Sequence, residues 1–400
     1  MDFESISAII FILALGIFLY RYRKYVCVQK ILYPVVYIIM LRTKVGIEAM
    51  DKAAQRYRRF LVYAGYTAVV VGFIGMGIIA FSLLDNLYKM LFIPAAAPGV
   101  GIVQPFSRNI PGTFFVPFFY FIISIFILVI VHEFSHGVMA RVYGLKIKSS
   151  GLAVLSIIAP ILPAAFVEPD EKKLVKRPYR EQLSIFAAGP FANIVTAVIM
   201  LLLIGFAVNP VVAKVVDYDG VVVTGLMKDH GSMIFPAEKA GMQKGEIIRE
   251  IDGISILTVE NFTKSLDKKL IGETISLKTN RTGYMVKLAE NPLQPESKKP
   301  YLGVFVMQKT KIKESFSSRY SKITADFILW FAGLFLWLYI LNLGIGLFNL
   351  VPIPVCDGGR MLQIALMRFM SQEKADKIWK NVGVFFIALI LINLVLGFVK

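Results

Sequence analysis

The chain has 400 residues, of which 56% are hydrophobic and only 18% are charged. This composition excludes an ordinary water-soluble protein and predicts a chain that lies in a bilayer. The formal net charge of +17 does not indicate a nucleic-acid partner, because the basic residues are distributed by loop between apolar runs.

Six uncharged apolar runs are long enough, or nearly so, to cross a membrane as helices. The first of them is marginal in length. The runs are residues 5–20, 61–84, 113–131, 183–213, 327–356 and 381–399. We therefore expect a mainly α-helical polytopic membrane protein with about six transmembrane helices.

The basic residues alternate from loop to loop. Residues 21–59 contain ten Lys or Arg, residues 85–112 contain two, and residues 141–182 contain eight. Because Lys and Arg stay on the cytoplasmic side, the loops are expected to lie inside, outside and inside in turn. The 357–380 loop is then also on the cytoplasmic side, and the N-terminus is on the outer side of the membrane. We therefore expect a multi-pass protein of the cell membrane.

Residues 21–60 connect the first two runs. They contain an apolar patch, residues 31–41, that is too short to cross a membrane. We expect this patch to lie at the membrane interface or to re-enter the bilayer from one side.

The motif His132-Glu133-Phe134-Ser135-His136 closes the third apolar run. Residues four apart share one face of a helix, so His132 and His136 can hold one metal ion. Glu133 lies off that face, where its carboxylate can reach an attacking water without being a ligand. Two of the three histidines of the chain fall in this pattern, which favours a metal centre over two polar residues at a helix end.

Residues 148–168 follow the motif. Their β-branched residues and the prolines Pro160 and Pro163 disfavour a spanning helix. We expect a membrane re-entrant hairpin that dips toward the site, which is allowed only where protein or water satisfies its backbone.

The fourth run contains Pro190 and Asn193. Pro190 removes a helical hydrogen bond and Asn193 places an amide in hydrocarbon, so we expect a polar cavity beside them. Asn193 is a candidate catalytic residue, because its amide can donate to a peptide oxygen that becomes negative. The alternative is an amide that packs between helices.

Residues 217–308 have a different character. Charges return, and short β-rich runs alternate with turns. This pattern predicts a soluble α+β domain, which the alternation of loops places outside the cytoplasm.

Two histidines leave a tetrahedral zinc ion short of a protein ligand. Asp357 follows Pro352 and Pro354, which cannot continue a regular helix, so the fifth run must unwind there. Asp357 then lies at the cytoplasmic membrane edge, at the depth of the two histidines. It is our candidate for the third ligand, and a simple helix end with a turn is the alternative.

The chain resembles the site-2 protease family of intramembrane zinc metalloproteases in three motifs, which follow in this order: His132 to His136, Gly189-Pro190-Phe191-Ala192-Asn193, and residues 349–359. The resemblance covers about residues 113–400 and excludes the first two runs. It implies that Zn2+, one ion per chain, is bound by His132, His136 and Asp357, with Glu133 as the base. It also implies that Asn193 and Asn349 lie around the site, Asn349 in contact with substrate, and that the hairpin pairs with unwound substrate.

The soluble domain carries a second resemblance. Residues 236–248 and Ile251-Asp252-Gly253 resemble a bacterial-type PDZ domain. A circularly permuted carboxylate-binding loop is implied for substrate-binding residues Tyr301, Leu302, Gly303 and Val304. A PDZ domain binds a peptide or a C-terminal tail, and in the family it is taken as a filter on substrate access.

Four parts of the chain are therefore expected. They are an N-terminal two-helix membrane region (1–112), a first part of the catalytic membrane core (113–213), a PDZ-like extracytoplasmic domain (214–310) and a second part of the core (311–400). We expect an intramembrane endopeptidase that cuts single-span membrane proteins near the cytoplasmic face, surrounded by membrane lipid and without a nucleic-acid partner.

Two other functions fit parts of this pattern. A non-catalytic membrane receptor for peptides would use the metal only to stabilise its helices, although such a site has no use for Glu133. A transporter with a metal midway ranks last, because the motif lies near one membrane edge and the sequence shows no inverted repeat.

Overall fold

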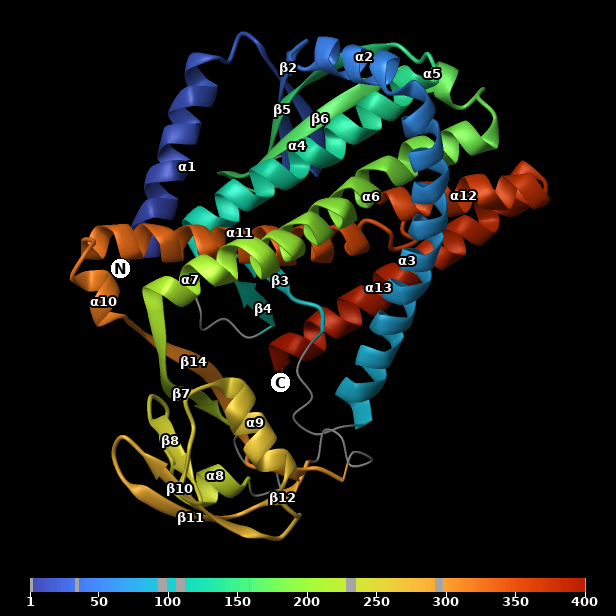
Figure 1. Cartoon of the computed structure of the whole chain (residues 1–400). Coiled ribbons are helices and arrows are strands. Elements are labelled where there is room, and N and C mark those ends of the chain that lie inside the picture. Colours follow the sequence, from blue (N-terminus) through green and yellow to red (C-terminus); the bar gives the residue numbers. More distant parts are fainter. Residues whose placement is uncertain are drawn as a thin grey trace. The chain divides into compact units, whose positions relative to one another are not determined.

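The computed structural model describes residues 3–32, 36–92, 99–105, 112–157, 159–227, 235–291 and 298–399. The chain divides into two compact units, which are described separately here (Figure 1). Unit 1 comprises residues 1–87, 98–205 and 333–400, and unit 2 comprises residues 88–97 and 206–332.

Five helices of the described chain are long and apolar enough to cross a membrane. They are α3 (Arg58–Phe92), α4 (Phe118–Val142), α6 (Tyr179–Leu203) with its continuation through η1 (Ile204–Val208) and α7 (Asn209–Val215), α11 (Lys322–Phe348) and α13 (Gln372–Val399). Together with the apolar composition, these helices make the chain a multi-pass membrane protein.

The first apolar run differs from the other five. It forms α1 (Phe3–Arg21), a helix of 19 residues that is about 29 Å long at 1.5 Å per residue, against a hydrocarbon core of about 30 Å. Among the described residues, five of the about six expected spans are therefore long spanning helices, and α1 is marginal in length.

A four-stranded sheet lies in unit 1, with strand order β1-β2-β5-β6 and antiparallel neighbours. Of the re-entrant hairpin expected over residues 148–168, the structure shows the two strands, β5 (Ile147–Ile157) and β6 (Ala159–Pro169), and their entry into a membrane stays a prediction. The apolar patch of residues 31–41 supplies parts of β1 (Val26–Leu32) and β2 (Val36–Thr43). That patch is therefore part of a hairpin paired with β5, a partner that the sequence did not indicate.

The C-terminal half of α4 is held between other elements of unit 1. It contacts β6, α6 and the short helix α2 (Ile47–Arg56), and Figure 1 shows the sheet strands alongside α4. Small and aliphatic side chains fill this core, among them Ala54, Met139, Ala140, Leu145, Leu174 and Ile185. Leu174 ends the one-turn helix α5 (Glu171–Leu174). The motif therefore lies on a helix whose position is fixed by packing on several sides.

The helix α11 unwinds as the prolines predict. It ends at Phe348, and a new helix, α12 (Asp357–Phe369), begins after a non-helical stretch. The N–H of Gly358 donates to the carbonyl of Asn349 at 2.8 Å, which closes this stretch into a turn. A Cβ at Gly358 would collide with the backbone of Leu350. The 357–380 segment, treated above as a loop, thus contains a helix, and it packs on α6 and α13.

Unit 2 contains an α+β fold from β7 to β14, which we call the inserted domain. Its main sheet has the order β11-β10-β8-β7-β14, with β9 paired to β8. The strands are β7 (Val216–Leu226), β8 (Ile247–Ile251), β9 (Ile254–Ser255), β10 (Thr274–Thr279), β11 (Gly283–Lys287) and β14 (Val304–Ile312). Its buried core includes Val221, Ile248, Ile251, Ile275 and Leu277.

Smaller elements complete the two units. The inserted domain also contains α8 (Pro236–Lys239), α9 (Val259–Asp267) and a pair of short strands, β12 (Ala289–Glu290) and β13 (Pro300–Tyr301). The helix α10 (Glu314–Ser317) follows β14, and unit 1 contains a parallel pair, β3 (Ile102–Gln104) and β4 (Thr113–Phe115).

Candidate metal centre

Three side chains of unit 1 bring one ligand atom each to a common point. His132 and His136 lie one turn apart on α4, and their Nε2 atoms are 3.1 Å from each other. The Oδ2 atom of Asp357, the first residue of α12, is 3.1 Å from the Nε2 atom of His132 and 3.4 Å from that of His136. Among the described residues, these three form the group that could hold a metal ion.

The spacing of the three atoms fits a tetrahedral ion. Ligand atoms about 2.0 to 2.1 Å from a zinc ion lie about 3.3 Å apart at tetrahedral angles. A metal ion also requires that each Nε2 lacks a proton. For His136 the structure meets this requirement, because its Nδ1 lies 2.7 Å from the carbonyl of Ile185, which accepts a hydrogen bond from a proton on that nitrogen.

Gly189 of α6 leaves room for the two imidazoles. A Cβ at this position would collide with Nε2 of His136 and would lie 2.7 Å from Nε2 of His132. The helix backbone of α6 therefore approaches the ligand atoms as closely as a residue without a side chain permits. The motif containing Gly189 was noticed in the sequence for Pro190 and Asn193, whereas the contact of Gly189 with the histidines was missed.

Asn193 contacts His132. Its Nδ2 atom, as the amide is placed, lies 3.1 Å from the Nδ1 atom of His132, and the side chain is fully buried. If His132 keeps Nε2 free for a metal ion, its proton is on Nδ1, and the amide must then be turned over so that its Oδ1 atom accepts this proton. Asn193 then orients a ligand, a role different from the oxyanion donor expected from the sequence.

Glu133 lies beside the ligand atoms without joining them. Its Oε2 atom accepts a hydrogen bond of 3.0 Å from the backbone N–H of Val167 in β6. Both residues line a cavity of about 530 Å³ that also contains the three candidate ligands. The carboxylate is thus held by the hairpin, in the same cavity as the three candidate ligands. The sequence could not reveal the contact with Val167, because it uses a backbone atom.

Asn349 lines the same cavity. Its carbonyl accepts the N–H of Gly358, so it also helps to place Asp357. The structure therefore brings together six predicted site residues of unit 1: His132, Glu133, His136, Asn193, Asn349 and Asp357.

The four predicted substrate-binding residues of the inserted domain lie around the start of β14. Leu302 is a core residue with 2% of its surface exposed, and its carbonyl accepts the N–H of Ala237 at 2.9 Å. Gly303 has φ of +81°, and its carbonyl accepts the N–H of Met227 at 3.0 Å. The Leu302 side chain is thus unavailable to a ligand, and a peptide carboxylate would have to bind backbone N–H groups of this loop.

Comparison with known proteins gives several relatives. An uncharacterized protein of Methanocaldococcus jannaschii is 28% identical over 330 residues, which cover 80% of this chain and 75% of that protein. Zinc metalloprotease RasP of Shouchella clausii is 24% identical over 52% of this chain and 57% of its own length. RasP of Oceanobacillus iheyensis is 24% identical over 49% of this chain and 56% of its own length. The chain thus spans a little more than half the length of either RasP.

Among solved structures, the PDZ domain of an SdrC-like protein from Listeria monocytogenes is 24% identical. The match covers 22% of this chain and 90% of that domain, with a TM-score of 0.19.

The family comparison covers the part of the chain that contains the candidate metal centre. The model of peptidase family M50 matches residues 120–390, a range that includes both histidines of α4, Asn193 and Asp357. Since this match extends over more than half of the sequence, the chain belongs to peptidase family M50.

Proposed function

We propose that this protein is a zinc-dependent endopeptidase of the site-2 protease type, which hydrolyses peptide bonds within or near transmembrane segments. The observation that carries the proposal is the position of Glu133. Glu133 belongs to α4, a helix long and apolar enough to span a membrane, and its carboxylate lies in the same cavity as three converging ligand atoms. The relatives named zinc metalloprotease RasP support the same activity and the same metal.

The proposed chemistry divides between the metal ion and the chain. A zinc ion held by His132, His136 and Asp357 would supply a Lewis acid that polarises the scissile carbonyl. Glu133 takes a proton from the attacking water and returns it to the leaving amine. The N–H of Val167 keeps the Glu133 carboxylate in place through this exchange.

A helical substrate must unwind before it can react, because its carbonyls are occupied by helical hydrogen bonds. The edge of β6 can replace those bonds by adding the substrate as a further strand. The bond between Val167 and Glu133 supports this role, because it places the strand edge directly at the proposed base.

The inserted domain is proposed to select substrates. Among the described strands of its main sheet, β14 is at the edge and pairs with β7, and α9 contacts both strands. An extended peptide or a C-terminal tail can therefore add to β14 in the manner of a PDZ ligand. From the distribution of Lys and Arg, we place this domain outside the cytoplasm and the cleavage near the cytoplasmic face.

The second candidate is a membrane peptide receptor in which the metal is structural. The position of Glu133 argues against it. A structural metal site has no use for a carboxylate that lies beside the ligands and is not itself a ligand. A general base, in contrast, must lie close to the metal without binding it.

The test is co-expression with a tagged single-span membrane protein that wild type cleaves. Glu133→Gln keeps the shape of the side chain and should abolish cleavage while the purified variant retains zinc. Asp357→Ala should lose both zinc and cleavage. Cleavage by a zinc-loaded Glu133→Gln variant would refute the mechanism, and full zinc occupancy in Asp357→Ala would identify a different third ligand.

A further inference from the structure

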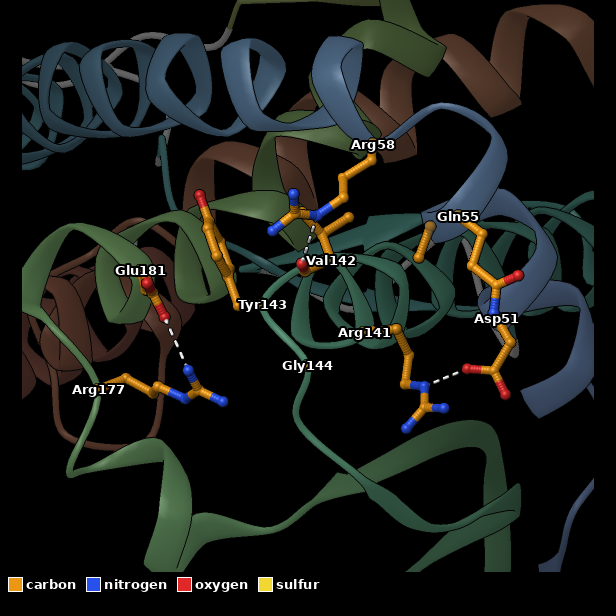
Figure 2. Close-up of a pocket in the computed structure, with 10 residues that line it drawn as sticks. Asp51, Gln55, Arg58, Arg141, Val142, Tyr143, Gly144, Arg177 and Glu181 are labelled. Carbon is orange, nitrogen blue, oxygen red and sulfur yellow. Dashed lines mark hydrogen bonds and ion pairs between the residues drawn. The ribbon is translucent and has the colours of Figure 1, made fainter.

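A second cavity, of about 560 Å³, lies at the C-terminal end of α4 (Figure 2). Its wall is built by the end of α2, the start of α3, residues 141–144 and the segment that leads into α6. It shares no lining residue with the cavity around the metal centre. Its most prominent feature is a set of three arginines, Arg58, Arg141 and Arg177, that come from three different segments.

Two of these arginines bind the turn that ends α4. The Nε atom of Arg58 donates to the carbonyl of Val142 at 3.4 Å. The Nη1 atom of Arg141 donates to the carbonyl of Leu145 at 3.1 Å. Each guanidinium has N–H groups beyond those used in these two bonds.

The third arginine approaches the same turn from the opposite side. The Nη2 atom of Arg177 lies 3.7 Å from the position that a Cβ of Gly144 would occupy. Gly144 has φ of +72° and carries no side chain. The cavity is therefore lined at Gly144 by backbone without a side chain, and Figure 2 shows Arg58, Arg141 and Arg177 arranged around this turn.

Two carboxylates face these cations, and they neutralise them only in part. Asp51 accepts a hydrogen bond from the Nε atom of Arg141. Glu181 Oε2 lies 3.7 Å from the Nη1 atom of Arg177, which is too long for a hydrogen bond. Among the residues that the structure describes, no carboxylate lies within ion-pair distance of Arg58. The lining thus has one more cation than carboxylates.

An anion with several oxygens matches this arrangement. Phosphate oxygens accept paired N–H bonds from the planar fork of a guanidinium, and arginine is the residue best suited to such contacts. The lining segments are those that the charge distribution assigns to the cytoplasmic edge of the membrane. Anionic lipid headgroups concentrate at that edge, and basic pockets between helices bind them.

We propose that this cavity binds a phosphate group, with the headgroup of an anionic lipid as its source in the membrane. The bound group bridges α3, α4 and the segment that leads into α6. The anion therefore ties together the end of α4, which carries His132 and His136, and the start of α6, which packs on those two histidines through Gly189. The proposal concerns binding alone and does not depend on peptidase activity.

The test uses the purified full chain in lipid nanodiscs and in detergent. Nanodiscs of phosphatidylcholine with a minor share of phosphatidylglycerol are dissolved, and native mass spectrometry identifies the lipid that stays bound. Binding of inorganic phosphate is measured separately in detergent by calorimetry. The variant is the double substitution Arg58→Gln with Arg177→Gln. The matched control is Arg59→Gln with Arg180→Gln, which removes the same charge from exposed neighbours outside the cavity.

Wild type and control should retain phosphatidylglycerol in preference to phosphatidylcholine. The double variant should bind at least about tenfold more weakly, because it loses two guanidinium groups that can donate charge-assisted hydrogen bonds to the phosphate. Arg58→Lys with Arg177→Lys should recover part of the affinity. Zinc content and circular dichroism verify that each variant is folded.

The two arms separate the sources of the phosphate. Loss of phosphatidylglycerol retention in the double variant supports a lipid site, and loss of calorimetric phosphate binding alone supports a site for a free phosphate group. Equal retention of phosphatidylglycerol by the double variant and its control, with equal or absent phosphate binding, would overturn the proposal.

Discussion

The backbone N–H of Val167 donates a 3.0 Å hydrogen bond to the Oε2 atom of Glu133. In an antiparallel ladder the N–H groups of an edge strand alternate between the partner strand and the open side. The N–H of Val167 is one that faces away from β5. A backbone atom of the hairpin therefore fixes the carboxylate that we propose as the base.

Replacing Val167 by proline tests this contact. Proline removes the N–H but is tolerated on an edge strand where that group faces away from the ladder. Loss of one bond to a carboxylate should lower the cleavage rate roughly tenfold while zinc content stays unchanged. Val167→Ala keeps the N–H and serves as the control. An equal loss of rate in both variants would assign the effect to the side chain.

Gly189→Ala should strongly reduce zinc binding, because the added methyl group would occupy the space of the His136 and His132 rings. A methyl group added at Gly344 on α11 would meet no other atom within 4 Å, so Gly344→Ala is the matched control and should keep its zinc. Zinc per chain is measured by mass spectrometry on purified protein. Full occupancy in Gly189→Ala would show that α6 can move away from the histidines.

Substitutions of Asn193 distinguish its two candidate roles. If the amide oxygen accepts the Nδ1 proton of His132, Asn193→Leu should weaken zinc binding by about 10- to 100-fold. Asn193→Asp keeps an acceptor and should retain the metal. If Asn193 instead donates to the oxyanion, both variants should bind zinc normally and cleave slowly. Zinc titration against a chelator, combined with cleavage assays, separates these results.

Asp252 makes the folding stability of the inserted domain depend on pH. Its Oδ2 atom is 2.7 Å from the Nζ atom of Lys269, and its Oδ1 atom accepts the N–H of Ser276 at 2.7 Å. The bond from Lys269, followed by the bond from Ser276, holds the pKa of Asp252 below its ordinary value of 3.8. The ionised Asp252 carboxylate therefore stabilises the folded domain at pH values above 3.8. This contribution is lost as the pH falls through the lowered pKa.

The variant Asp252→Asn isolates this charge. Asp252 has φ of +48°, and asparagine tolerates the left-handed conformation well, so the backbone turn before Gly253 should persist. Hydrogen exchange of β8 and β10 in the full chain should be several-fold faster in the variant at neutral pH. The difference should shrink as the pH drops below 3.8. A difference that is constant with pH would mean that the charge of Asp252 does not contribute.

Site residues that are placed by local chain geometry could be predicted from the sequence, and those placed by helix packing could not. The relation of His132 to His136 depends on helical periodicity alone, and Asp357 was found because Pro352 and Pro354 must interrupt α11. Local chemistry determines both features. The roles of Asn193 and Gly189 depend instead on which helix packs against α4, and a single sequence does not contain that information.

The sheet of unit 1 illustrates the same limit for the fold. The β-branched residues and prolines of the 148–168 segment predicted a hairpin, which is present. The pairing of β2 with β5 joins residues more than a hundred positions apart, such as Arg42 and Gly151. No turn residue fixes this register, so only the folded chain shows it.

The attachment of β1 and β2 to β5 also has a mechanical consequence. A lone two-stranded hairpin is marginally stable in water, so it would deform when a force acts on its free edge. Here the force on β6 passes into a four-stranded sheet, of which β5 and β6 contact α4. A peptide that binds to β6 near the histidines would therefore meet a rigid sheet. Most of the conformational change on binding would occur in the peptide and not in the sheet.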